Sequence, residues 1–580
     1  MRPALGIGLL LFVAAFVFAA WGLSSIPVSS FAVHVDRQSA VAPDGEVDWR
    51  VTVVPQVDSA RLTARLDRNT ELPLVPDAHG RLTAELRELA PGYHFVEASV
   101  HRLGGREDRV VDVIAAGPFQ SEHTRGCDVA LGLSPQAVRM LLLPALEHKV
   151  VEGAKTQEEF FGPTSYVVAS ELTLVDGGIS FTVELSTTAE DKGDLSIDGV
   201  VEVSSVGVRG VSLRLRELRR ATPGPKLTAL AAKEGGKRGT TAGAGGGAVV
   251  GALFGGPGGA VVGGILGGLA GNAIGKRLGE REAGQRTESE VYGALVAGLA
   301  QATEELRLPS QVSMLPTTPA LLGSVQWCEP LKIDATRGMR AALALRIPAD
   351  EFSDAARVLA VYRGSEVGAI ATVASGHNAR LEVSEDLVNR LLAEWTVRGG
   401  FDEAVADAGL ASAIEKELGA RTRWRVPDIR VALPPVVRLD DDAIGISLGG
   451  VTMRLVDEGR SQSRDVVVGG VGTIELDIRD GGTATISGSL DQAYFGCRVP
   501  DLDRRVLPAC FSSAVDPELI RKKINLAIMV NAARLPGIDL SGLVQLRSAE
   551  ATGSPLALQD ARVAAAAGVL SLDATLVPLP

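Results

Sequence analysis

The sequence predicts an α+β fold: two similar halves, each of long helices wrapped by long antiparallel twisted strands, preceded by an all-β sandwich and an N-terminal transmembrane helix. Three observations predict this arrangement. Short alternating strands occupy the first part of the chain, a helix–strand–helix pattern then occurs twice, and an apolar segment leads the chain. With 580 residues the chain has room for about three to five domains of ordinary size.

The overall charge and the residue composition exclude some classes of partner. The chain has 58 Lys and Arg against 70 Asp and Glu, a net charge of −12. A broad phosphate-binding face is therefore not expected, and we predict no nucleic-acid partner. Aromatic residues make up only 4% of the chain, which argues against a platform for stacking bases or sugars.

The first 27 residues resemble a targeting segment. An uninterrupted apolar stretch runs from Ala4 to Leu23, and as a helix it would span about 30 Å, the thickness of the bilayer core. This length favours a signal anchor. A cleaved signal peptide is the alternative, because small residues stand at Val17 and Ala19. In both cases we expect the chain after residue 27 to be exported to the cell envelope, periplasmic or at the cell surface. With the signal anchor that the length favours, the protein is membrane-anchored.

The four cysteines are interpreted in the light of this expected export. In an oxidising compartment an even number of cysteines favours disulfides over metal sites. Cys497 and Cys510 enclose a short polar loop, and we expect them to be bonded to each other. Cys127 and Cys328 would then close the ends of a whole region. A zinc site is a poor alternative because no CxxC pair exists.

Residues 28–120 are predicted to form a β-sandwich. Short alternating runs, such as Val47 to Val53 and Leu82 to Leu86, recur about every ten residues between turn signals. Strands at this spacing are typical of an immunoglobulin-like sandwich. Such a domain would serve as a spacer or an adhesion module.

Residues 127–330 are predicted to form the first half. Ser134-Pro135 begins a helix that carries Leu142 and Leu146. Long alternating strands follow, and a second helix over residues 288–306 places Leu295 and Leu299 on one face.

Residues 331–580 repeat this layout as the second half. Ser384 caps a helix that carries Leu387, Leu391 and Trp395 and stops at Gly399-Gly400. Long strands are expected over residues 428–439, 443–455, 464–478, 543–549 and 569–577. Between them, a helix that begins at Asp516-Pro517 places Ile524 and Ile528 on one side.

Residues 240–280, within the first half, contain glycine at every fourth position from Gly243 to Gly279. Glycine at this spacing removes side chains from one ridge of a helix, so that a second helix can approach closely. Pro257 divides the run into two apolar arms, and basic residues flank them. We therefore expect a membrane hairpin that is able to form homo-oligomers through its glycines; a flexible linker is the alternative. The central glycines of the hairpin are Gly247, Gly251, Gly255, Gly259, Gly263, Gly267 and Gly271.

The two halves resemble the tubular lipid-binding (TULIP) superfamily, typified by bactericidal/permeability-increasing protein. The stretches that carry this resemblance are residues 381–395 with Gly399-Gly400, residues 534–538, residues 544–546 and residues 568–576. The resemblance covers residues 128–580 and implies a rolled sheet around a long helix in each half, with an apolar groove for acyl chains. Residues 240–280 separately resemble the glycine-zipper segment of bacterial outer-membrane antigens.

Motifs for catalysis, cofactors or metals are missing from the sequence. The seven histidines are scattered, no HExxH or GxSxG occurs, and the glycine-rich run lacks the strand that a dinucleotide site needs. Asp440 to Asp442 are interpreted as a solvated turn rather than a calcium site. We therefore predict no enzyme activity, no cofactor and no metal.

The sequence thus predicts an envelope-anchored protein that binds or transfers phospholipid or another acyl lipid. The residues expected to line the lipid grooves are Leu142, Leu146, Leu295, Leu299, Leu387, Leu391, Trp395, Ile524 and Ile528. The alternative is a structural or secretion-assembly component of the cell envelope without a lipid cargo.

Overall fold

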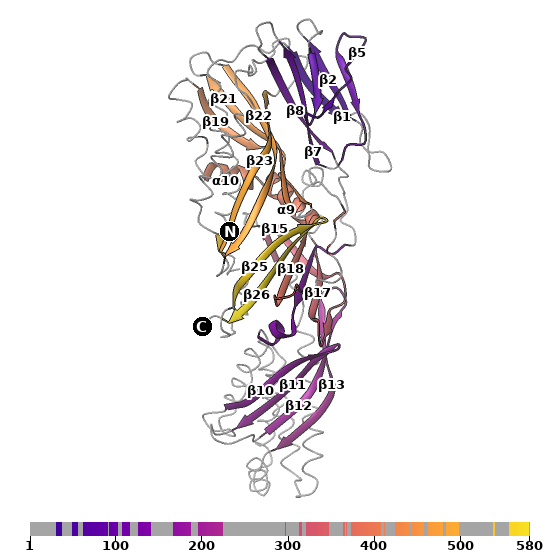
Figure 1. The fold of residues 1–580 in the computed structure, drawn as a ribbon, viewed down its shortest axis with the longest axis vertical. Helices are drawn as coiled ribbons and strands as arrows, with labels where there is room; N and C mark the ends of the chain where they lie inside the picture. Colours follow the sequence, from indigo (N-terminus) through magenta and orange to yellow (C-terminus); the bar gives the residue numbers. More distant parts are fainter. Residues whose placement is uncertain are drawn as a thin grey trace.

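The computed structural model shows an elongated molecule in which four regions of sheet follow one another along the long axis (Figure 1). A β-sandwich and a long-stranded sheet occupy one end, a central sheet the middle, and a four-stranded sheet the other end. The residues described are 31–37, 49–55, 62–90, 92–101, 107–116, 126–140, 166–186, 195–223, 296, 312–315, 321–346, 364–365, 367, 373–407, 411, 424–440, 443–457, 462–479, 483–497, 538–539 and 556–578.

The N-terminal region is a sandwich of two four-stranded antiparallel sheets that share one core. Alternating residues of both sheets, among them Val51, Ala84, Ala98 and Ile114, are buried between them. One sheet has the order β1 (Phe31–Arg37), β2 (Trp49–Pro55), β6 (Leu82–Leu86), β5 (Val75–Pro76). The other has the order β4 (Thr70–Glu71), β3 (Leu62–Leu66), β7 (Gly92–His101), β8 (Glu107–Ala116).

The opposite end of the molecule is a four-stranded meander. Each strand pairs with the next in sequence, and a tight turn at Gly177, where φ is +76°, joins the first two. Only glycine adopts such an angle without strain. The strands are β10 (Tyr166–Val175), β11 (Gly178–Ser186), β12 (Leu195–Val206) and β13 (Gly210–Pro223).

The central sheet has eight strands, drawn from distant parts of the chain. Strand β9 lies in its middle, although its neighbours follow it by more than two hundred residues. The sheet therefore combines strands from both of the halves that the sequence suggests. Its order is β14 (Val312–Leu315), β15 (Leu321–Trp327), β17 (Gly338–Arg346), β9 (Val129–Leu133), β18 (Ala379–Ser384), β26 (Val569–Pro578), β25 (Leu556–Ala566), and β16 (Lys332–Asp334) pairs with β17.

A six-stranded sheet of long strands lies beside the sandwich. Pro434 and Pro435 lack the N–H that a continuous strand requires, so the single strand expected over residues 428–439 is divided into two. The order is β19 (Trp424–Val431), β21 (Ala443–Asp457), β22 (Gln462–Arg479), β23 (Thr483–Cys497), β24 (Ile538–Asp539), and β20 (Val436–Asp440) pairs with β21.

Helix α9 (Glu385–Val397) connects the central sheet to this six-stranded sheet, and α10 (Gly400–Asp407) follows it. Ser384 has an extended backbone, and its side-chain oxygen accepts the N–H of Leu387, which begins α9. Gly399, at φ +76°, ends it. The sequence therefore predicts both ends of α9 correctly.

The predicted fold class is wrong. The described residues are predominantly β, and their helices are short: α9, α10 and residues 135–140. Long helices wrapped by sheets are not what organises the fold. The physical reason is that the long alternating segments pair with one another, as β21, β22 and β23 do along most of their lengths. Where their side chains are described, residues such as Val471 pack against the sandwich.

The expected N-terminal transmembrane helix is likewise not a feature of the described fold. In the described part of the chain, no helix is long and apolar enough to cross a membrane. Residues 1–27 and the predicted hairpin over residues 240–280 lie outside the described residues.

Candidate functional site

One face of the central sheet consists of apolar residues, nine aliphatic and one aromatic, arranged in two rows across the strands. Residues paired directly across antiparallel strands have side chains on the same face, so the register defines the rows. The first row is Trp327, Leu343, Val129, Val383 and Leu570. The second row is Ala341, Leu131, Leu381, Leu572 and Val563. We refer to these ten residues as the aliphatic face.

The aliphatic face is incompletely covered. Leu381, at its centre, has 36% of its surface exposed, and every other member except Ala341 is half-buried. The next row along the same face, which includes Leu133, Ala379 and Ala574, is buried in a core shared with β10, β11 and β12. The sheet is thus covered at one end of this face and open beside it.

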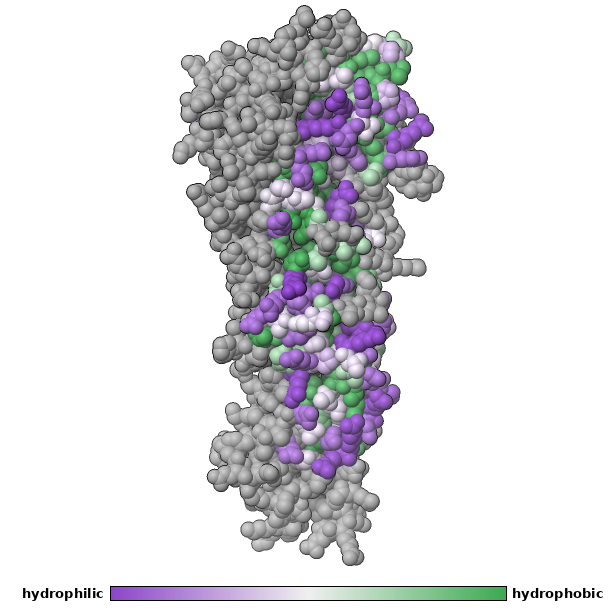
Figure 2. Space-filling view, in the orientation of Figure 1, coloured by the Kyte–Doolittle hydropathy of each residue, from purple (hydrophilic) through white to green (hydrophobic). Residues whose placement is uncertain are grey.

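The opposite face of the same strands carries their charged side chains, beside a small buried apolar cluster. Arg380 of β18 forms ion pairs with Glu382, at 2.7 Å, and with Asp573 of β26, at 3.0 Å. Ser571 and Arg340 also point to this side, as the alternation along β26 and β17 requires. The central sheet is therefore amphipathic, with one aliphatic and one charged face. In the orientation of Figure 1, Figure 2 shows hydrophobic patches interrupted by hydrophilic ones along the described residues.

Helix α9 is fixed to its surroundings by buried polar side chains. The carboxylate of Glu385 accepts the N–H of Leu439, and that of Asp386 accepts the N–H of Ser365. Asn389 binds both the N–H and the C=O of Val437, at 2.7 and 3.0 Å. These contacts attach α9 to β20 and to the loop around residue 365, so its position is set by hydrogen bonds as well as by packing.

Arg390 connects α9 to the end of strand β17. Its Nη2 donates to the carbonyl oxygen of Leu345, and the guanidinium lies 3.5 Å from the buried carboxylate of Asp128. Burial, followed by the neighbouring charge of Arg346, lowers the pKa of Arg390 below its ordinary value, although Asp128 opposes this shift. The Asp128 carboxylate also accepts the N–H of Leu345, so one carboxylate orders both the helix and the strand.

Three of the sequence-predicted lipid-lining residues lie on α9 and not on the strands of the aliphatic face, and the other six lie outside the described residues. Leu387 is buried, Leu391 is half-buried, and buried Trp395 packs on Phe401 with ring centroids 4.1 Å apart. Those outside the described residues are Leu142, Leu146, Leu295, Leu299, Ile524 and Ile528.

Sequence reasoning missed the strand residues of the aliphatic face. The signal was present in short alternating segments such as residues 379–384, in which Ala379, Leu381 and Val383 alternate with polar residues. Alternation indicates an amphipathic strand, but it does not show which face another element covers. The partners that build the rows come from β9, β17 and β26, far away in the sequence.

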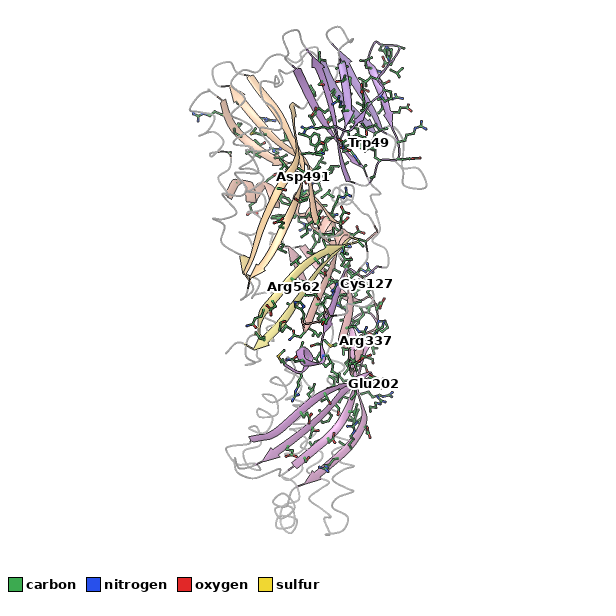
Figure 3. The ribbon with its side chains drawn as sticks, viewed as in Figure 1. Trp49, Cys127, Glu202, Arg337, Asp491 and Arg562 are labelled. Carbon is green, nitrogen blue, oxygen red and sulfur yellow. A yellow bond between two sulfur atoms is a disulfide. The ribbon has the colours of Figure 1, made fainter. Side chains whose placement is uncertain are left out.

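The disulfide between Cys127 and Cys328, the pairing expected from the sequence, is present in the structure. It lies among Ala130, Ala342 and Val367, and Figure 3 labels Cys127 near the middle of the molecule. Cys510 lies outside the described residues, so its bond to Cys497 stays a prediction, as does the hairpin of Gly247 to Gly271. The described residues contain no cluster of three or more His, Cys, Asp or Glu suited to a metal ion.

The fold and the site together define a mostly β protein whose central sheet has one open aliphatic face. No family model matches the chain, and no curated protein matches it significantly. Among solved structures, the crystal structure of lipopolysaccharide binding protein is similar over 78% of this chain and 100% of that chain, with 11% identity and a TM-score of 0.26. A likeness this weak assigns neither fold nor function.

Proposed function

We propose that this protein binds the alkyl chains of lipids along the aliphatic face of its central sheet. The observation that carries the proposal is that two rows of aliphatic side chains, centred on Leu381, are left partly exposed across five paired strands. Contiguous exposed apolar surface is uncommon on soluble proteins and marks a site that another apolar surface covers.

The chemistry of the face suits a chain of methylene groups. Such a site needs no catalytic or charged group, because burial of each methylene contributes about 0.8 kcal/mol. Six methylenes laid across the two rows would supply about 5 kcal/mol before the entropy cost of binding. The only polar group on the rows is the indole N–H of Trp327, and it already donates to the carbonyl oxygen of Gly210, at 2.8 Å.

The test replaces Leu381 with glutamine in the full chain. The amide interrupts the centre of the second row, and we expect the affinity for a fluorescent fatty acid or phospholipid to fall about tenfold, since about 1.4 kcal/mol of apolar contact is lost. Lipid extracted from the purified variant and measured by mass spectrometry should fall in parallel. Val397→Gln is the matched control, because Val397 is also 36% exposed but lies at the end of α9.

Two results would contradict the proposal. In the first, the wild-type protein carries no lipid and takes up no labelled lipid. In the second, Leu381→Gln and Val397→Gln reduce binding equally, which would show that the loss of lipid affinity does not depend on the aliphatic face. The first result would favour a structural or secretion-assembly role in the cell envelope, and the second would place lipid binding elsewhere on the molecule.

We further propose that the protein works on the exported side of a membrane and has no catalytic role. The Cys127–Cys328 disulfide supports export, because such bonds persist mainly in oxidising compartments. A lipid carrier that acts by apolar contact requires no reactive side chain. Membrane lipid is the partner that this proposal implies.

A further inference from the structure

Arg340, on the polar face of the central sheet, is a buried arginine without a partner. It lies on β17, has only 8% of its surface exposed, and its Nε and Nη1 are buried with no hydrogen-bond partner. Its register neighbours are Gly132 on β9 and Lys332 on β16. Neither residue brings a carboxylate to its side.

Arg380, in the same cross-strand row, has the ion-pair partners that Arg340 lacks. Gly132 separates the two arginines and contributes no side chain to the row. Arg380 is bound by two carboxylates, those of Glu382 and Asp573. Lys332, on the other side, pairs with Glu329 at 3.5 Å and remains partly exposed. Among the described residues of this row, Arg340 is thus the cation that is both deeply buried and without an ion pair.

An unpaired buried guanidinium is energetically expensive. For Arg340, the charge has lost most of its water, and the N–H groups on Nε and Nη1 have gained no acceptor in exchange. An arginine cannot relieve this cost by losing its proton, because its pKa is too high. A bound anion relieves both costs at once, because an oxygen that carries negative charge accepts the N–H groups and compensates the charge.

We propose that Arg340 binds an oxyanion, a carboxylate or a phosphate group, on the polar face of the central sheet. The site is independent of the aliphatic face, because residues 339 and 341 point to the other side of β17. Gly132 contributes no side chain to the row beside the guanidinium, and Lys332, which pairs with Glu329, lies one strand away. The oxyanion comes either free from solution or as the head group of a lipid.

The experiment measures the thermal stability of the full chain in increasing phosphate, with sodium chloride at matched ionic strength as the reference. We expect phosphate to raise the Tm of the wild-type protein by more than chloride does, because a ligand that binds only the folded state stabilises it. In Arg340→Met this anion-specific rise should disappear. Without phosphate, the Tm of Arg340→Met should equal or exceed that of the wild type, since the substitution removes an uncompensated charge.

Lys332→Met is the matched control. It removes the same charge from the neighbouring strand, but from a partly exposed side chain with its own partner, so it should keep most of the phosphate-specific rise. If Arg340→Met does not fold, Arg340→Lys takes its place. It retains the charge but loses the planar set of N–H donors, and it should show a smaller rise than the wild type.

Short-chain lipids in place of phosphate distinguish the two sources of the anion. Dihexanoyl phosphatidic acid and dihexanoyl phosphatidylcholine are compared with inorganic phosphate at equal concentration. A shift that is larger with phosphatidic acid than with phosphate or phosphatidylcholine, and that is lost in Arg340→Met, assigns the site to a head group. An Arg340-dependent shift that is equal for phosphatidic acid and phosphate assigns it to a free oxyanion. If the wild type shows no rise beyond the chloride reference, or Arg340→Met and wild type rise equally, the proposal is overturned.

Discussion

His94 of the sandwich is held in its charged form by two acceptors. Its Nδ1 lies 2.7 Å from the carboxylate of Asp67, and its Nε2 lies 2.8 Å from the carbonyl oxygen of Ala90. Both contacts are hydrogen bonds only when both ring nitrogens carry protons. Burial lowers the pKa of His94, but the hydrogen bonds to Asp67 and Ala90 outweigh it, so its pKa lies above the ordinary value of 6.5.

The stability of the sandwich should therefore depend on pH through His94. Because the pKa is raised on folding, the protonated pair stabilises the fold fully below pH 6.5, and this contribution is lost as the pH rises through the folded-state pKa. We expect Tm to fall over that range and His94→Gln to remove the fall. His79→Gln, at an exposed histidine of the same sandwich, is the control and should leave the pH profile unchanged. A profile that is the same in all three proteins would contradict this assignment.

At the scale of elements, two asparagines bind strand backbone as a neighbouring strand would. Asn389 of α9 binds both backbone groups of Val437, and Asn378 binds both backbone groups of Leu576, at 2.7 and 2.9 Å. Both asparagines are buried. A side-chain amide has one donor and one acceptor in the same relation as a peptide group, so it completes a ladder where no strand is available.

Replacing Asn389 with leucine should destabilise the fold by about 2 to 4 kcal/mol, because two backbone groups of half-buried Val437 lose their partners in the buried side chain of Asn389. Urea unfolding followed by circular dichroism measures the change. Thr396→Val, on the same helix, is the control. Its hydroxyl only adds a bond to the carbonyl of Leu392, so its removal should cost less than about 1 kcal/mol. Equal costs for the two variants would show that Asn389 does not support β20.

The local signals in the sequence predict individual elements well. Ser384 and Gly399 define the ends of α9, and the alternation over residues 569–577 predicts β26. The same signals do not reveal long-range pairing, such as β9 between β17 and β18. Periodicity also cannot show that a polar residue such as Asn389 faces inward. This is why the sequence predicts strands and helices but neither the fold class nor the aliphatic face.

At the scale of the whole molecule, the sandwich docks on the six-stranded sheet where that sheet has glycines. Phe95 of β7 stacks on Tyr494 of β23, with ring centroids 3.9 Å apart, and Arg68 lies over the same tyrosine ring. A Cβ atom on Gly469 would lie 2.2 Å from the ring of Phe95. The missing side chain therefore allows the two domains to approach closely.

Gly469→Ala should weaken this interface, because the added methyl group also meets the backbone oxygen of Leu448, at 2.8 Å, and has no room to move. We expect a loss of about 1 to 3 kcal/mol in stability and an increased maximum dimension by small-angle X-ray scattering. Gly445→Ala is the control, since its Cβ would meet nothing closer than 3.3 Å. Unchanged scattering and stability in Gly469→Ala would show that the domains do not depend on this contact.

The disulfide between Cys127 and Cys328 makes the chain between them a covalent ring, closed across 201 positions. The ring includes β9, all of the β10–β13 sheet and the glycine-repeat segment. Its two ends meet at one place beside β17, so a segment inside the ring can grow, shrink or be cut without separating those ends. Closing a longer loop costs little extra entropy. Insertions between the two cysteines are therefore tolerated, and the glycine repeat lies in this part of the chain.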